Sequence, residues 1–322
     1  MNGGEMKKLL IIDALNLFIR NYVVNPSMDR DGNNVGGCIG FIKSLQKITR
    51  EMKPDEIVVA WDGHGGSQRK RTMNKEYKEG RTPIRFNRRM ISLSPEAQEK
   101  NKHYQHIMLM EYLNEMPVIQ LVCDYVEADD VIAYVSQMEH YKGWKKYIVS
   151  SDKDFLQLIN EEVEVYRPIK NQIIGIDTLM EEYGILPSNF ALARAIAGDS
   201  SDNLKGVGRV GLKTLRKKIP LFGSQSIEIN ELMQHCNSVE KKYACHNKIL
   251  ENRKLIEDNY DIMQLYEPNM SYVNRQSIEY NVTNFEPEFN KLEITKKLFK
   301  DGLSHNNLEQ LFLTFKKIRS NK

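Results

Sequence analysis

The sequence predicts an α/β fold: a mainly parallel central sheet flanked by helices, followed by a mostly helical second part. Between residue 7 and about residue 175, short β-branched runs alternate with amphipathic helical patterns, as in strand–helix–strand units. From about residue 176 onward, the spacing of apolar residues becomes helical. We therefore expect one domain at 6–175 and a second, helical domain at 176–322.

The composition is that of a protein with a substantial core. A chain of 322 residues, 41% of them hydrophobic, can bury one large or two modest cores. No apolar run approaches the length that spans a membrane, so we expect no membrane association. The four cysteines show no disulfide pattern, which is typical of a reducing compartment, and we expect a cytoplasmic location.

In the first part, the apolar runs are followed by acidic residues. The acids that follow these runs are Asp13, Asp62, the group Glu127, Asp129 and Asp130, and the pair Asp152 and Asp154. Such runs are typical of buried parallel strands, and the carboxyl ends of parallel strands meet at one edge of the sheet. Helices are expected between the strands, one with Cys38, Phe41, Ile42, Leu45 and Ile48 on its face, another with Ile107, Met110, Glu111 and Leu113.

Residues 64–95 interrupt this alternation with a basic insertion. From Arg69 to Arg89 there are nine Lys or Arg residues against two Glu, although the net charge of the whole chain is only +3. A charged solvated loop is one interpretation. Its position directly after the Asp62 strand favours a functional insertion that projects over the predicted site.

The second part is expected to form helices at 177–184, 188–197, 209–218, 225–235 and 238–258. Asp199 and Asp202 fall between the second and third of these. Gly206–Gly211 matches the dinucleotide pattern GxGxxG, but no strand precedes it, and the basic residues that follow favour a DNA phosphate over a pyrophosphate. A last apolar stripe, from Leu308 to Ile318, predicts a helix that packs on the protein's own core or, less favoured, docks a replication partner.

The acidic residues predict a metal site. Five segments far apart in the sequence would bring acids to one edge, where their charges would repel without a cation. Hard divalent ions prefer carboxylate oxygens, so we expect such ions there. The candidate ligands are Asp13, Asp62, Glu127, Asp129, Asp130, Asp152, Asp154, Asp199 and Asp202.

In this order the motifs resemble those of the structure-specific 5′ nucleases, the family of flap endonucleases and 5′–3′ exonucleases. The resemblance rests on Ile12-Asp13, Trp61-Asp62, Glu127–Asp130, Ser151–Asp154, Gly198–Leu204 and Gly206–Thr214. In length the chain is most similar to the single-polypeptide phage enzymes, for which the location would be the host cytoplasm. The resemblance implies a PIN-like core, a basic arch at about 64–95, and a helix–three-turn–helix motif at about 188–218.

The resemblance also implies roles for individual residues. Asp13, Asp62, Glu127 and Asp129 would surround one Mg²⁺ or Mn²⁺ ion, and Asp152, Asp154 and Asp202 a second, with Asp130 and Asp199 nearby. Lys78 and Arg81 of the arch would contact the scissile phosphate and assist catalysis. The implied nucleic-acid contacts are Arg20, Lys70, Val210, Gly211, Lys213 and Thr214.

The chain departs from the family pattern at two positions. Ile19 replaces an aromatic residue found in many relatives, and Phe18 or Tyr22 is a candidate substitute for base stacking. Arg209 stands where relatives have the first glycine of a GxG turn, which puts the monovalent-cation site of that turn in question.

The implied function is hydrolysis at 5′ ends or flaps of DNA and of RNA–DNA hybrids, by a monomer. The implied partners are a single-strand-binding protein or a sliding clamp. Two alternatives remain open at this point: a PIN-type ribonuclease acting on free RNA, and a DNA-binding scaffold that does not catalyse. The basic arch and the glycine–lysine hairpin argue against the first, and the retention of all nine acids argues against the second.

Overall fold

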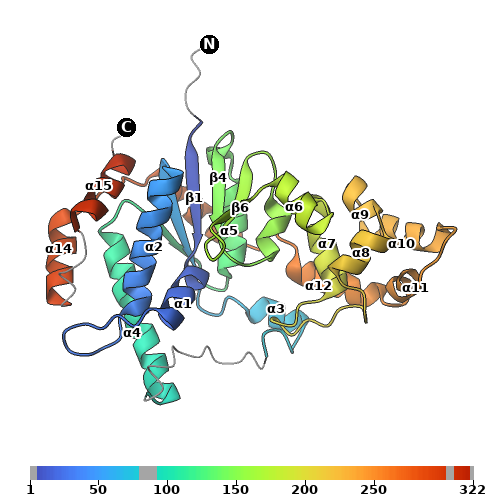
Figure 1. Ribbon diagram of the computed structural model, residues 1–322, viewed down its shortest axis with the longest axis horizontal. Helices are drawn as coiled ribbons and strands as arrows, with labels where there is room; N and C mark the ends of the chain where they lie inside the picture. Colours follow the sequence, from blue (N-terminus) through green and yellow to red (C-terminus); the bar gives the residue numbers. More distant parts are fainter. Residues whose placement is uncertain (1–5, 80–92, 302–307, 320–322) are drawn as a thin grey trace, which may run out of the picture.

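The computed structural model describes residues 6–79, 93–301 and 308–319, and Figure 1 shows their arrangement. One six-stranded sheet has the order β3-β2-β1-β4-β5-β6. Its strands are β1 (Lys8–Asp13), β2 (Glu56–Trp61), β3 (Ile119–Val122), β4 (Lys145–Val149), β5 (Val163–Arg167) and β6 (Gln172–Ile174). All neighbours pair in parallel except β5 and β6, so the predicted, mainly parallel sheet is confirmed.

Both faces of the sheet are covered, which explains why its strands are apolar throughout. Along β1, Leu9 and Ile11 belong to one buried cluster, whereas Leu10 and Ile12 belong to another, because successive side chains point to opposite faces. The second cluster holds α1 (Ala14–Val24), α2 (Gly36–Met52) and α4 (Pro95–Asn114) against the sheet. The predicted face of α2 is confirmed, because all five of its named residues are buried.

The predicted face of the helix before Pro117 is only partly confirmed. Leu113 is buried and Met110 is half-buried, but Glu111 is exposed and Ile107 is 60% exposed. Besides Leu113, α4 buries Gln105, Met108, Leu109 and Tyr112. The side chain of Gln105 is drawn inward because its Oε1 accepts hydrogen bonds from the backbone N–H groups of Gly37 and Cys38. Because Gln105 satisfies these buried N–H groups, the buried face of α4 differs from the face that the spacing of apolar residues predicts.

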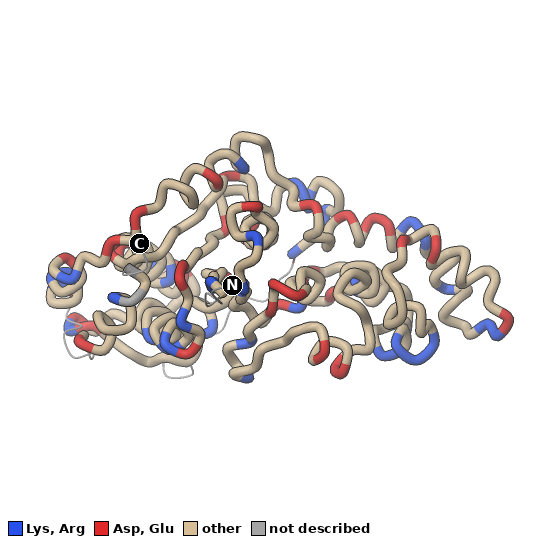
Figure 2. Tube along the Cα trace, turned by 90° about the horizontal axis from the view of Figure 1, so that it is seen from above, with Lys and Arg blue, Asp and Glu red and all other residues tan. Residues whose placement is uncertain are grey.

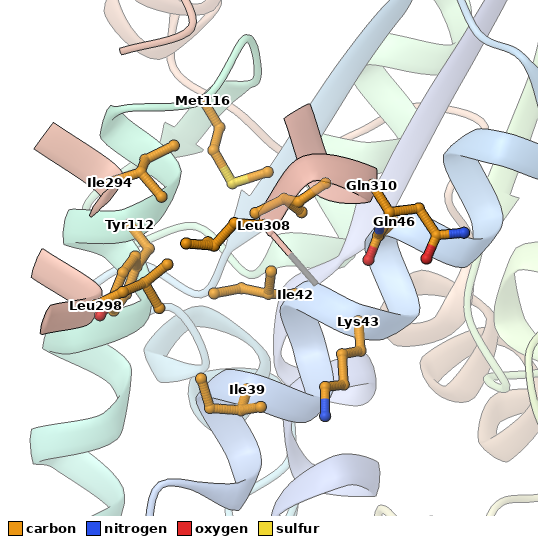
Figure 3. Close-up of a pocket in the computed structure, with 11 residues that line it drawn as sticks. Ile39, Ile42, Lys43, Gln46, Tyr112, Met116, Ile294, Leu298, Leu308 and Gln310 are labelled. Carbon is orange, nitrogen blue, oxygen red and sulfur yellow. The ribbon is translucent and has the colours of Figure 1, made fainter. Parts of the chain in front are cut away.

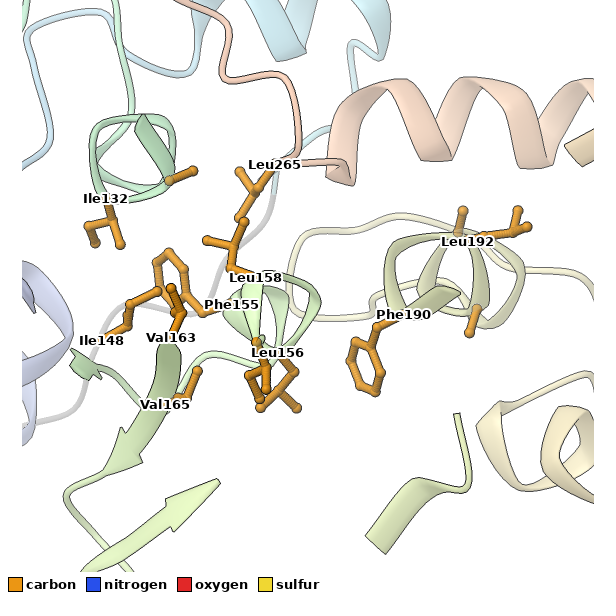
Figure 4. Packing of buried hydrophobic residues seen from close by; sticks show 14 of the residues in the cluster. Ile132, Ile148, Phe155, Leu156, Leu158, Val163, Val165, Phe190, Leu192 and Leu265 are labelled. Atoms are coloured by element: carbon orange, nitrogen blue, oxygen red, sulfur yellow. The ribbon is translucent and has the colours of Figure 1, made fainter. Parts of the chain in front are cut away.

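The other face of the sheet joins the helical second part. It carries α5 (Ala128–Gln137) and the short 3₁₀ helix η3 (Asp154–Leu158), against which α7 (Pro187–Ala197) packs. Figure 4 shows Phe155, Leu156 and Leu158 of η3 among Val163 and Val165 of β5, Phe190 and Leu192 of α7, and Leu265. This packing fixes the segment that carries Asp154.

Most helices of the second part extend away from the sheet, at the right of Figure 1. They are α6 (Ile176–Tyr183), α8 (Leu212–Lys218), α9 (Leu221–Ser224), α10 (Ile229–Ser238), α11 (Ala244–Glu251) and α12 (Arg253–Met263). The next helix, α13 (Tyr272–Thr283), instead packs against β3, and its Glu279 accepts a hydrogen bond from the hydroxyl of Tyr134 of α5 at 2.6 Å. The prediction of a single helix at 238–258 is wrong. Ser238 is the last residue of α10, residues 239–243 lie between α10 and α11, and Asn252 separates α11 from α12. The remaining short elements are α3 (Gln68–Met73) and η2 (Glu139–Tyr141).

The last two helices, α14 (Lys291–Lys300) and α15 (Leu308–Arg319), return to the first part and lie beside α2 and α4 (Figure 1). Leu311, Phe315 and Ile318 are buried in the cluster with α2, so this stripe packs on the protein's own core and not on a partner. A cavity of about 340 Å³ remains between these helices, and Figure 3 shows its apolar lining, with Gln46 and Gln310 at one side.

The charge distribution is mixed over the molecule. Figure 2 shows basic and acidic positions interspersed along its whole length. None of the helices in the described part of the chain is long and apolar enough to cross a membrane.

Candidate metal centre and nucleic-acid contacts

The acids that follow β1, β2 and β4 lie at one edge of the sheet. Asp13 is the last residue of β1, which pairs with β2 on one side and β4 on the other, so Asp62 and the segment after Val149 flank it. Ser150 links two of them: its Oγ donates to Asp13 Oδ2 at 2.8 Å and accepts from the backbone N–H of Asp152 at 3.0 Å. The sheet topology therefore brings these acids together, as the sequence predicts.

Asp152 lies among the other acids. Burial, with the charges of Asp152 and Asp62 adding to it, raises the pKa of Asp13 to about 7, although hydrogen bonds from Asn16 and Ser150 oppose the shift. Burial also raises the pKa of Asp129 and of Asp154, and the charge of Asp152 adds to both shifts. Asp152 is thus close enough to act on three separate carboxyl groups.

A second group of carboxylates forms where the loop after α7 meets η3. Oxygens of Asp154, Asp199 and Asp202 lie within 4.8 Å of one another. The loop is closed by two backbone hydrogen bonds between Asp199 and Leu204, at 2.8 and 2.7 Å, which hold both of its acids in place. Among the described residues, these three are the acidic side chains whose oxygens already lie close enough together to bind one metal ion.

Glu127 is the most tightly paired acid of the site. It precedes α5, is buried, and binds the ammonium groups of Lys70 and Lys78, each at 2.6 Å. Burial would raise the pKa of Glu127, but the two lysines lower it to about 2. The hydroxyl of Tyr77 adds a third contact at 3.3 Å. A negative carboxylate is therefore neutralised here by side chains from the basic insertion.

The base of that insertion is attached to the loop of the second group. The backbone N–H of Lys78 donates to the carbonyl oxygen of Asp202 at 2.9 Å, and Asn203 Nδ2 donates to the carbonyl of Glu76 at 3.0 Å. Lys78 adopts a left-handed backbone with φ 56°, which an L-residue seldom does unless its surroundings enforce it. Its ammonium group is turned toward Glu127 by this arrangement.

Two acids of the predicted set also serve local structure. Asp62 Oδ1 accepts from the N–H of Ala128 at 2.9 Å, at the start of α5. Asp130 is buried and accepts from the N–H of Asn269 at 2.9 Å, so it links α5 to the chain after α12. Burial raises the pKa of Asp130.

The predicted phosphate-binding hairpin precedes α8, which begins one residue after Gly211. Val210 is buried, Gly211 and Lys213 are exposed, and the N–H of Thr214 binds the carbonyl of Gly211 at 2.8 Å. Arg209 has φ 64°, so it occupies the left-handed conformation that a glycine would adopt without strain. No strand precedes this turn, because α7 and the loop with Asp199 do, which excludes a Rossmann arrangement.

The other predicted contacts have mixed outcomes. Arg20 lies partly buried on α1, and Arg81 lies outside the described residues. The suggestion that Phe18 or Tyr22 stacks on a base is wrong for this structure: they are 0% and 2% exposed and pack in the core beneath α2 and α4. Ile19 at the predicted stacking position is partly buried.

Three residues of the site were not foreseen from the sequence. They are Ser150, Tyr77 and above all Arg194, whose guanidinium binds Asp154 at 3.0 Å through Nε and Asp199 through a terminal nitrogen. Arg194 is a single cation in the otherwise apolar stretch Phe190–Ala197 of α7, and that isolation is the one signal the sequence offers.

The residues fit divalent metal ions. Asp13 and Asp154 have pKa values of about 7 because burial disfavours their charged forms, and a dication would favour the charge again. All the candidate donors are carboxylate oxygens, the ligands of hard divalent ions. Glu127 would need to exchange its lysine partners for an ion, whereas Asp152 accepts only a backbone N–H among the hydrogen bonds found for it.

Comparison with known proteins identifies the family of this chain. A family model for the 5′–3′ exonuclease N-terminal, resolvase-like domain matches residues 8–184. The flap endonuclease Xni of Shewanella woodyi is 31% identical over 261 residues, 81% of this chain and 93% of that protein. A 5′–3′ exonuclease of Buchnera aphidicola is 32% identical over 213 residues, 65% of this chain and 69% of that protein. The chain therefore belongs to the 5′–3′ exonuclease family, the structure-specific 5′ nucleases.

Solved structures agree on the fold. The bacteriophage T5 flap endonuclease, in a complex with DNA and metal ions, superposes with a TM-score of 0.64 at 16% identity, over 95% of this chain and 99% of that one. The similarity confirms the PIN-like α/β architecture.

Proposed function

We propose that this protein is a divalent-metal-dependent 5′ nuclease that hydrolyses phosphodiesters at 5′ ends or flaps of DNA and of RNA–DNA duplexes. One observation carries the proposal: carboxylates from separate strand ends share one edge of the sheet with two lysines of the basic insertion. The family membership supports the same activity. Removal of primers during DNA replication is the role that such a substrate range suits.

The carboxylates would hold two Mg²⁺ or Mn²⁺ ions. Asp13, Asp62, Glu127 and Asp129 would bind the first, and Asp152, Asp154 and Asp202 the second, with Asp130 and Asp199 close by. Bound ions of this kind acidify water and neutralise the charge that develops on phosphate oxygens. Asp152, whose charge acts on Asp13, Asp129 and Asp154, would thus be close to candidate ligands of both ions.

The lysines of the insertion would act on the substrate. With Glu127 serving as a metal ligand, the ammonium group of Lys78 would be available at the edge of the sheet to bind the scissile phosphate and stabilise its charge. Lys70 would steady the strand near the insertion, and Arg81 would assist Lys78. Val210, Gly211, Lys213 and Thr214 would bind a phosphate further along the duplex, and Arg20 one near the site.

Because these contacts address phosphates and not bases, recognition should follow the shape of the substrate. We expect the protein to work as a monomer. A single-strand-binding protein or a sliding clamp remains a proposed partner, and it would use a surface other than the buried face of α15. We propose no monovalent cation at the hairpin, because Arg209 occupies the position of the first glycine in the GxG turn of relatives.

The test is cleavage of a labelled 5′-flap duplex and of an RNA-primed duplex. We expect both to be cut in Mg²⁺ and neither to be cut in excess chelator. Free single-stranded RNA of the same sequence should be a poorer substrate, since it lacks the junction. Full activity in chelator, or preference for the free RNA, would overturn the proposal.

A further inference from the structure

Arg194 places a permanent positive charge inside the second carboxylate group. Its Nε donates to Asp154 Oδ1 at 3.0 Å, and a terminal nitrogen donates to Asp199 Oδ2. Both acids are members of the group whose oxygens, with those of Asp202, lie within 4.8 Å of one another. The cation therefore binds two of the three carboxylates that would take up a metal ion.

The position of Arg194 is rigid. It lies in the last turn of α7, is 9% exposed, and is flanked by the buried residues Ala193 and Ala195. The helix itself packs on η3, which carries Asp154. A guanidinium stays protonated at any physiological pH, so this charge cannot be removed by titration. Arg194 thus differs from a surface lysine, which can leave a carboxylate at little cost.

We propose that Arg194 is a built-in counterion of the second carboxylate group, which orders Asp154 and Asp199 before a metal ion arrives and weakens the affinity of the group for that ion. The inference rests on the proposed metal dependence. With Arg194 present, the three carboxylates and the guanidinium sum to a charge of about −2, which one dication balances. Without it, the same carboxylates would attract a dication more strongly and repel one another more when empty.

The proposed consequence concerns exchange of the metal ion. An ion bound too tightly would slow the release of the cleaved end, whereas an ion bound more weakly could dissociate together with it. Arg194 is a positioning residue in this scheme, because it acts through Asp154 and Asp199 and not on the substrate.

The experiment is a calorimetric titration of the metal-free protein with Mn²⁺ alone, in the absence of DNA, at a fixed pH near 7.5. Arg194→Met should bind Mn²⁺ about tenfold more tightly than the unsubstituted protein, because one opposing charge is gone. Arg194→Lys should stay within about threefold of the unsubstituted protein, because it keeps the charge. The gain should vanish in Arg194→Met with Asp202→Asn, if it arises at the second group.

The matched control is Arg167→Met. Arg167 is 7% exposed and pairs with the more exposed Glu182 at 2.9 Å, so its guanidinium is about as buried as that of Arg194, and its hydrogen bonds go to Glu182 and Tyr183 and not to a candidate metal ligand. Its loss should lower the stability of the protein and leave Mn²⁺ affinity unchanged. If Arg194→Met cannot be purified free of metal, Arg194→Gln takes its place in the same titration.

Unchanged or weaker Mn²⁺ binding by Arg194→Met, or a lysine variant that behaves like the methionine variant, would overturn the role of Arg194. If the unsubstituted protein binds Mn²⁺ and cleaves a flap while this happens, the proposed function stands and only the inference falls. If the unsubstituted protein binds no Mn²⁺ at all, both fall.

Discussion

The two halves of the carboxylate site are neutralised by different means. At Glu127, the cations are Lys70 and Lys78, two long side chains from the insertion predicted at 64–95. At Asp154 and Asp199, the cation is Arg194, a buried residue of helix α7, which packs against η3. Both halves solve the same problem, because buried carboxylates without a counterion would be costly.

The difference lies in what can move. A lysine on the insertion can exchange a carboxylate for a metal ion and then serve a phosphate, while the arginine on α7 stays where it is. The first half is therefore built to reorganise when ions and substrate bind, and the second half is built to remain ordered.

The largest effect is expected from Asp152→Ala, because the charge of Asp152 reaches both halves. Cleavage of a 5′ flap in Mg²⁺ should fall by about a thousandfold or more, since the second ion loses one of its carboxylate ligands. Flap binding, measured by anisotropy in chelator, should change little. Asp177→Ala, which alters an exposed acid in the first turn of α6, is the control and should cleave normally. Retention of activity by Asp152→Ala would remove it from the centre of the site.

Lys78→Ala tests the mobile half. The single-turnover rate of flap cleavage should fall by about a hundredfold, because a charge that stabilises the transition state is lost, while flap affinity should weaken only a few-fold. Lys75→Ala, an exposed lysine of the same turn, provides the comparison. Equal rates for Lys78→Ala and the unsubstituted protein would show that Lys78 serves only Glu127.

The pH dependence of stability tests the carboxylates that lack lysine partners. Burial raises the pKa of Asp13 and of Asp154 to about 7, so between about pH 4 and pH 7 the folded protein binds protons that the unfolded chain has released. The free energy of unfolding should therefore decrease as the pH rises through 7. In chelator, urea unfolding at about pH 8 should give a value about 2 kcal/mol or more below that at about pH 5.5.

Mg²⁺ should abolish most of that difference, because a bound dication favours the charged carboxylates. Glu127 contributes in the opposite direction, since its pKa is lowered to about 2, but its stabilisation is lost only as the pH falls below about 4.5. A chelated protein that is more stable at pH 8 than at pH 5.5 would contradict the burial of these acids.

The smallest effect is expected from Tyr77→Phe. The variant removes the hydroxyl that contacts Glu127 at 3.3 Å and keeps the buried ring. The free energy of unfolding should fall by about 1 kcal/mol or less, because both lysines still neutralise Glu127. Urea unfolding measures it, and Tyr147→Phe on β4 is a comparison without a Glu127 contact. A loss of several kcal/mol would mean that Tyr77, and not the lysines, holds the carboxylate.

The sheet edge could be predicted from the sequence because topology leaves it little freedom. Asp13 ends a strand whose neighbours are β2 and β4, so any acid just after those strands must lie nearby. The acidic stretch with Asp199 and Asp202 could be included among the candidate ligands from the sequence, but its place beside η3 could not be predicted, because it depends on how α7 packs. Apolar spacing by itself does not say where a helix of the second part will lie.

What could not be predicted depends on single contacts. Arg194 stands in an apolar helix, where spacing gives no hint that two acids lie within reach of its guanidinium. Phe18 and Tyr22 looked available on the first helix but are covered by α2 and α4. In α4, Gln105 replaced Ile107 on the buried face because two backbone N–H groups needed an acceptor.

The hydrogen bond from the Lys78 backbone to the Asp202 carbonyl has a mechanical consequence. Because it joins two backbone segments, only a proline at position 78, which lacks the N–H, would remove it. A displacement of the turn at 74–79 is therefore transmitted directly to the loop after α7. A nucleic-acid strand that displaces the insertion would thereby also displace the loop with Asp199 and Asp202, because the backbone itself connects the two segments.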